Sequence, residues 1–163
     1  MSDEEHYKFM RIALEEAEKC TPVPTAFCVG CVLVSRNGGD PAVIATGYSR
    51  ELPGNTHAEA NALAKFRSSP EEKLITGESP QDILASADVY TTMEPCSIRT
   101  SGLAPCADAL IAAQVKRCFI GVGEPDDFVK CEGAQKLTEA GIQVVWLKGM
   151  EEEALAIARK GRA

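Results

Sequence analysis

Four side chains able to bind a metal ion or move a proton lie in two short segments of the 163-residue chain. His57 and Glu59 flank Ala58 in the first segment, and Cys96 and Cys106 each follow a proline in the second. Imidazole and thiolate are zinc ligands, and a catalytic zinc site has three protein ligands and leaves the fourth position to water. A carboxylate that is not a ligand, such as that of Glu59, can act as the catalytic proton carrier. The pattern therefore predicts an open zinc site with His57, Cys96 and Cys106 as its ligands.

Two predicted helix starts would position these side chains. Residues two apart in the middle of a helix point to nearly opposite sides, so His57 and Glu59 can face one site only if His57 lies at a helix start. The apolar residues that follow have helical spacing and predict a helix over about 57–66. Pro105 suits a first helical turn, so we expect Cys106 at the N-terminus of a helix over 105–114. The partial positive charge at such an N-terminus stabilises a thiolate.

The spacing of the two cysteines alone is weak evidence for a metal site. Two cysteines are more often buried core residues than ligands. Nine residues, 97–105, separate Cys96 from Cys106, and a loop of that length does not fix the second ligand locally. The combination with His57, with a proline before each cysteine and with a strand-like segment over 88–92, nevertheless favours zinc.

Length, charge and composition restrict the class of protein. The length suits a single domain over 1–163. A net charge of −7 and a pI near 4.9 argue against nucleic acid and favour a small-molecule substrate. No apolar run is long enough to cross a membrane, and the acidic start is unlike a signal peptide. We therefore expect no membrane partner and an intracellular, cytoplasmic protein, in keeping with seven cysteines that form no disulfide framework.

The remaining cysteines and the second histidine have simpler interpretations. Cys28 and Cys31 resemble a redox or zinc pair, but they lie in a strand-like run, where residues three apart point to opposite faces. Packing in the core is therefore expected for both of them. The same interpretation applies to three further cysteines, Cys20, Cys118 and Cys131. His6 belongs to the N-terminal helix, where we expect it to be exposed.

The order of elements predicts the fold. Helices are expected over about 3–20, 57–66, 105–114, 133–140 and 151–160, and strands over 29–35, 43–47, 88–92, 117–122 and 142–147. The turn signals at 36–41 predict that the first two strands pair antiparallel, and the polar stretch 68–86 is interpreted as a connection. Alternating strands and helices then predict a three-layer α/β/α sandwich around a mixed, mostly parallel sheet of about five strands.

Three segments, 47–60, 93–106 and 121–142, resemble the fungal deaminases of riboflavin biosynthesis, within the cytidine-deaminase-like superfamily. Zinc deaminases of nucleobases commonly have two residues between the cysteines, whereas the long spacing seen here is typical of the riboflavin subgroup. The resemblance covers nearly the whole chain. It implies the cytidine-deaminase-like fold, a Zn²⁺ cofactor and a dimeric or larger assembly, for which a homodimer is our expectation.

The resemblance also implies a substrate and candidate contacts with it. The reaction would be hydrolytic deamination of 2,5-diamino-6-ribitylamino-4(3H)-pyrimidinone 5'-phosphate, with release of ammonia. Bacterial relatives use an Asn and a His at positions that here correspond to Ala26 and Ser49, so Asn55 is the preferred ring contact, although it also suits a turn. For the phosphate, Arg99 competes with Arg50, and either can be a surface charge instead. The candidate substrate contacts are Ser49, Arg50, Asn55, Ala58, Ser97, Arg99 and Ser101.

Two other functions remain open at this point. One is a different deaminase of the superfamily, acting on a nucleoside, a nucleobase or tRNA adenosine, although the acidic charge counts against tRNA. The other is a non-catalytic module stabilised by zinc. Glu59 argues against this second alternative, because a structural zinc site does not need a free carboxylate beside an open position.

Overall fold

The computed structural model describes residues 3–22, 27–36, 40–52, 56–68, 79–95, 106–123 and 132–160. A five-stranded sheet in the order β2-β1-β3-β4-β5 forms its centre. The strands are β1 (Gly30–Ser35), β2 (Ala42–Tyr48), β3 (Asp88–Met93), β4 (Arg117–Val122) and β5 (Gln143–Trp146). The helices are α1 (Asp3–Glu18), α2 (Ala58–Arg67), α4 (Pro80–Ala85), α5 (Cys106–Ala113), α6 (Gly133–Glu139) and α7 (Glu151–Ala158).

The sheet is mixed, as expected. β1 pairs antiparallel with both β2 and β3, whereas β3, β4 and β5 pair parallel with one another. Since β1 is antiparallel to both of its neighbours, it alone runs against the other four described strands. The prediction of an antiparallel first pair in a mostly parallel sheet is confirmed. The parallel strands require crossover connections, and their helices α5 and α6 lie on one face of the sheet, whereas the first and last helices, α1 and α7, pack on the other.

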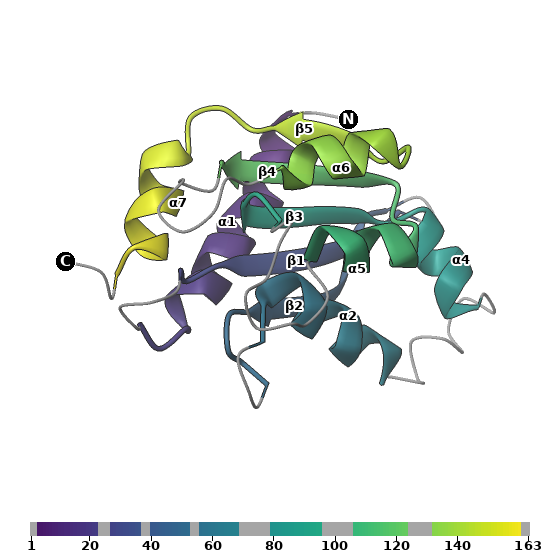
Figure 1. The fold of residues 1–163 in the computed structure, drawn as a ribbon, viewed down its shortest axis with the longest axis horizontal. Helices are drawn as coiled ribbons and strands as arrows, with labels where there is room; N and C mark the ends of the chain where they lie inside the picture. Colours follow the sequence, from purple (N-terminus) through teal and green to yellow (C-terminus); the bar gives the residue numbers. More distant parts are fainter. Residues whose placement is uncertain are drawn as a thin grey trace.

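Two helical layers cover the sheet. α2, α5 and α6 lie in front of it, and α1 passes behind it (Figure 1). Successive side chains of a strand point to opposite faces, so Leu33 packs with the layer of α2 and α5, whereas Val32 and Val34 pack with α1 and α7. In β4, Ile120 and Phe119 divide in the same way. The predicted three-layer sandwich is confirmed.

A short helix, α4, lies where the sequence predicted only a connection. Ser79 is its N-cap and accepts a hydrogen bond of 3.2 Å from the backbone N–H of Asp82. Ile83 and Leu84 are buried in the core shared with α2 and α5. The sequence did not predict this helix, because six residues are too few to show a helical period of apolar side chains. A serine followed by a proline is nevertheless a signal for the start of a helix.

His6 is the second correction, because its side chain is buried rather than exposed. Its ring stacks on Phe119 with centroids 4.3 Å apart, and Nδ1 lies 2.7 Å from the hydroxyl of Tyr90. Burial lowers the pKa of His6, and the nearby charges of Arg117 and Arg36 lower it further. His6 therefore belongs to the packing between α1 and the sheet.

The expectation that Cys28 and Cys31 pack in the core is confirmed, and they do so on opposite faces. Cys20 and Cys118 are also buried, whereas Cys131 lies outside the described residues. None of the helices in the described ranges is long and apolar enough to span a membrane.

Candidate active site

The N-terminus of α2 places the first two candidate residues. His57 is the N-cap, with an extended backbone (φ −103°, ψ 157°), and the helix begins at Ala58. Gly47 of β2 lies directly beneath this turn: a Cβ atom there would be 2.3 Å from the carbonyl oxygen of Ala58. The absence of a side chain at Gly47 therefore lets the helix start lie against the sheet. The predicted position of His57 at a helix start is confirmed.

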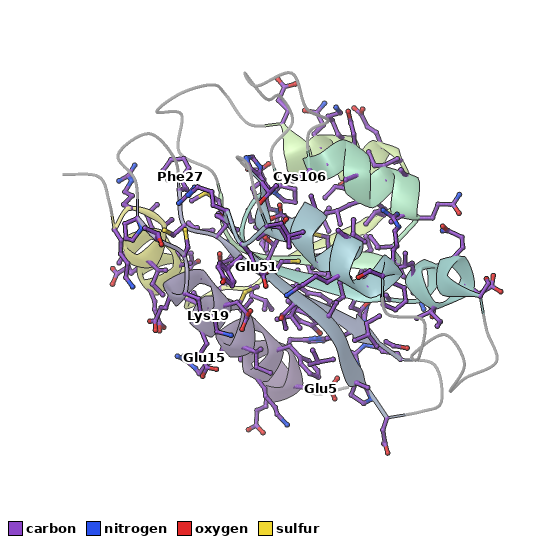
Figure 2. The ribbon with its side chains drawn as sticks, turned by 90° about the horizontal axis from the view of Figure 1, so that it is seen from below. Glu5, Glu15, Lys19, Phe27, Glu51 and Cys106 are labelled. Atoms are coloured by element: carbon purple, nitrogen blue, oxygen red, sulfur yellow. The ribbon has the colours of Figure 1, made fainter. Side chains whose placement is uncertain are left out.

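A second helix start carries the candidate thiol. Cys106 is the first residue of α5, as predicted, and its side chain is buried. Figure 2 shows Cys106 on one side of the sheet and α1, with Glu5, Glu15 and Lys19, on the other. Cys106 therefore belongs to the same layer as α2.

Folding brings His57 and Cys106 together, although 49 positions separate them in the sequence. Nδ1 of His57 lies 3.2 Å from Sγ of Cys106. Two such ligands of one tetrahedral zinc ion would be about 3.5 Å apart, given the usual Zn–N and Zn–S distances. The donor types and their separation thus suit a shared zinc ion. Cys96 lies outside the described residues, and within them no three His, Cys, Asp or Glu side chains group closely enough to hold a metal ion.

Glu59 is a buried carboxylate in the first turn of α2. The hydroxyl of Thr91 donates a hydrogen bond of 2.7 Å to its Oε1. The same hydroxyl lies 3.0 Å from the carbonyl oxygen of Met93, and because it has one hydrogen it can donate to only one of these two acceptors at a time. The sequence did not indicate a functional role for Thr91, because there it is only one residue of a predicted strand.

Glu94 is a second residue that the sequence analysis missed. Its backbone N–H donates to the carbonyl of Val122 (2.9 Å), and its Oε2 accepts a bond of 3.0 Å from the N–H of Ala134 at the start of α6. These contacts anchor the chain where it leaves β3 toward Cys96. No local signal in the sequence could have found this contact, because Glu94 and Ala134 are 40 positions apart.

Two other thiols on this face are poor candidates for ligands. Cys31 and Cys118 are fully buried, and burial raises the pKa of both thiols, with the charge of Glu59 as a second cause. A thiolate is the ligand form of cysteine, so these two residues are better suited to packing.

Three of the seven candidate substrate contacts lie within the described residues: Ser49, Arg50 and Ala58. The hydroxyl of Ser49 is buried and accepts a hydrogen bond of 2.9 Å from the N–H of Val29. Arg50 has a positive φ of 63°, and its N–H donates to the carbonyl of Thr56, directly before His57 (2.6 Å). Its guanidinium points to the end of α1, where Nη2 donates to the carbonyl of Thr21 at 3.1 Å.

Ala58 lies buried in the first turn of α2. Four other candidates lie outside the described residues: Asn55, Ser97, Arg99 and Ser101.

Asn61 holds the turn that leads into His57. It is buried, and its Nδ2 donates to the carbonyl of Tyr48 (2.9 Å) and to Oγ1 of Thr56 (3.0 Å). The hydroxyl of Thr56 in turn donates to the carbonyl of Leu52 at 2.8 Å. The end of β2 and the start of α2 are thereby joined by side-chain hydrogen bonds.

The architecture and the site together define a class. An α/β/α sandwich with a histidine and a cysteine in contact at two helix starts, and a buried glutamate in the first turn of one of these helices, has the residue types that zinc deaminases use. The chain belongs to the cytidine and deoxycytidylate deaminase family: the model of that family's zinc-binding region matches residues 3–122.

Individual relatives show which kind of deaminase the chain resembles. The chain is 43% identical over 156 residues to the diaminohydroxyphosphoribosylamino-pyrimidine deaminase of Schizosaccharomyces pombe. The alignment covers 96% of this chain but only 35% of that protein. The Aspergillus oryzae Rib2 deaminase, a C-terminal deletion mutant solved at pH 4.6, has a TM-score of 0.80 and 36% identity, covering 96% of this chain and 92% of that one. The same deaminase in complex with DARIPP has a TM-score of 0.79, with 35% identity and coverage of 96% and 91%. The resemblance to riboflavin-pathway deaminases is confirmed.

Proposed function

We propose that this chain is a zinc-dependent hydrolase that deaminates the phosphorylated diaminopyrimidine of riboflavin biosynthesis. The observation that carries the proposal is the approach of His57 Nδ1 to Cys106 Sγ, at 3.2 Å, next to the helical turn that holds Glu59. A site for structural zinc would not need that buried carboxylate.

The proposed ligands of the zinc ion are His57, Cys96 and Cys106. Two of these begin or cap a helix, where the partial positive charge of the helix N-terminus favours an anionic thiolate and an attacking anion. When bound, zinc would supply Lewis-acid activation that lowers the pKa of water toward neutrality.

Glu59 is the proposed proton carrier. Thr91 holds Oε1, which leaves Oε2 as the oxygen that we assign to proton transfer. Glu59 would accept a proton from the attacking water and deliver it to a ring nitrogen, and would later help to protonate the departing amine. The buried position of Glu59 limits competition from bulk water.

The substrate assignment is supported by the relatives. The S. pombe relative is named for a phosphoribosylaminopyrimidine substrate, and the A. oryzae relative binds DARIPP. We assign the phosphate to the segment over 97–102, with Arg99 as its charged donor, because a guanidinium makes charge-assisted hydrogen bonds to phosphate.

Ammonia release from a panel of compounds tests the proposal. The zinc-loaded protein is incubated with the diaminopyrimidine ribityl phosphate, its dephosphorylated form, cytidine and deoxycytidylate. We expect turnover of the first compound to exceed that of the others, and Glu59→Gln to abolish most of it. Preferred turnover of cytidine or deoxycytidylate would replace the substrate assignment, and no turnover of any compound would contradict the enzyme assignment.

A further inference from the structure

Two cysteine side chains outside the candidate active site lie in unusually close contact. Cys20 follows the C-terminus of α1 and Cys28 precedes β1, and their Sγ atoms are 2.9 Å apart. Non-bonded carbon atoms already pack at about 3.5–4.0 Å, and sulfur is larger than carbon. Packing of two separate thiols does not require so short a distance. A disulfide bond, at about 2.0 Å, would need only a small further approach.

Arg50 holds the two sulfur atoms from one side. Its Nη2 lies 2.8 Å from Sγ of Cys20 and 3.7 Å from Sγ of Cys28. The guanidinium also donates to the carbonyls of Thr21 and Phe27, which flank the cysteines along the chain. The Arg50 side chain therefore contacts the backbone next to each of the two cysteines.

The surroundings of the pair affect its reactivity in opposite directions. Burial raises the pKa of the Cys20 thiol, and the neighbouring Cys28 raises it further, whereas the charge of Arg50 acts to lower it. Since the thiolate is the nucleophile in thiol oxidation, the reaction should be slow at neutral pH and faster at higher pH.

We propose that Cys20 and Cys28 are a modification site that a peroxide oxidises to an intramolecular disulfide, joining the end of α1 to the segment that enters β1. One sulfur attacks a peroxide oxygen, the O–O bond breaks, and a sulfenic acid and one water form. The second sulfur then attacks the sulfenic sulfur and releases the other water. Overall, two thiols and one hydrogen peroxide give one disulfide and two waters, with two electrons passing from sulfur to oxygen.

Cys31 provides an internal reference for this site. The sequence alone would pair Cys28 with Cys31, since only two residues separate them. The two side chains, however, lie in different core clusters on opposite faces of the sheet. The structure thus assigns Cys20, and not Cys31, as the partner of Cys28.

A single tryptic peptide distinguishes a Cys20–Cys28 disulfide from a Cys28–Cys31 disulfide and from three free thiols. Trypsin cleavage after Lys19 and Arg36 releases residues 20–36, which contain all three cysteines. The folded, zinc-loaded protein is treated with hydrogen peroxide and then unfolded in denaturant that contains iodoacetamide, which alkylates the remaining free thiols. The protein is then digested, and its peptides are sequenced by mass spectrometry. We expect this peptide to carry one alkyl group, on Cys31, and to lack the two hydrogen atoms of the Cys20 and Cys28 thiols. The yield at a given time should be greater at pH 9 than at pH 7.

Matched variants complete the test. Cys28→Ala should abolish the disulfide, and Cys118→Ala, which alters another buried cysteine, should leave it intact. The oxidised protein should also melt a few degrees higher than the reduced one, because the bond restricts the unfolded chain, and dithiothreitol should reverse the shift. Alkylation of all three cysteines after peroxide treatment, or a single alkyl group on Cys20, would overturn the proposal.

Discussion

The hydroxyl of Thr91 in the central strand β3 donates a 2.7 Å hydrogen bond to Oε1 of Glu59 in the first turn of α2. Both side chains are buried, so the contact is protected from water. It orients the carboxylate that we assign to proton transfer, which makes Thr91 a positioning residue.

Loss of this contact should lower turnover more than substrate binding. We expect Thr91→Val to reduce kcat by roughly tenfold, the equivalent of about 1–1.5 kcal/mol for one hydrogen bond, with little change in KM. Thr91→Ser retains a hydroxyl and should recover much of the rate. Steady-state kinetics of the three proteins measures the effect, and a rise in KM at constant kcat would exclude the positioning role.

Glu59→Gln should separate metal binding from chemistry. The variant keeps the shape of the side chain and removes only its ability to carry a proton, so we expect zinc content to stay at the wild-type level. Turnover should fall by about 10²–10⁴-fold, the usual contribution of general acid–base catalysis. Metal analysis and ammonia release on the same sample give both values. Loss of zinc from this variant would make Glu59 a ligand instead.

Zinc content should depend on the two residues in contact at the helix starts. We expect about one zinc per chain in the wild type, and substantial loss of it in His57→Ala and in Cys106→Ala. Cys118→Ala serves as the control, because that thiol is buried in β4 and its pKa is raised by burial. Equal zinc loss in the control would attribute the effect to misfolding, and full retention in Cys106→Ala would remove that residue from the ligand set.

Arg99→Ala should discriminate between the phosphorylated and dephosphorylated substrates. We expect kcat/KM for the phosphorylated compound to fall by the equivalent of about 1.5–3 kcal/mol, the contribution of a charge-assisted hydrogen bond. The dephosphorylated compound should scarcely be affected. Arg50→Ala is the matched comparison, since that guanidinium is engaged by the carbonyls of Thr21 and Phe27. Equal losses on both compounds in Arg99→Ala would indicate support of the loop rather than phosphate binding.

His6 should contribute to acid sensitivity of the fold. Burial lowers its pKa below the ordinary value of 6.5, so the unfolded chain binds a proton more readily than the folded one. The free energy of unfolding should therefore decrease as the pH falls below about 6.5, toward the lowered folded pKa. Denaturant unfolding at several pH values, compared with His6→Gln, measures this contribution. A variant with the same pH dependence as the wild type would assign the effect to other groups.

The local parts of the site could be predicted from the sequence. The spacing of His57 and Glu59 required a helix start, and Pro105 indicated another at Cys106; both depend on the geometry of a few consecutive residues. Apolar periodicity likewise predicted the strands and all the described helices except α4, whose six residues are too few to show a period.

The sequence by itself thus determined the residue types of the proposed zinc site, the family resemblance and the order of most elements, because these are properties of neighbouring residues. Only the tertiary structure decided which distant side chains meet. Thr91 joins Glu59 across 32 positions, and His6 is buried against Phe119 because α1 crosses the sheet there. Cys28 lies against Cys20 rather than Cys31, because Cys28, just before β1, packs in the layer of α1, whereas Cys31 packs in the layer on the opposite face of the sheet. Such contacts depend on how helices pack on the two faces of the sheet, which no local pattern encodes.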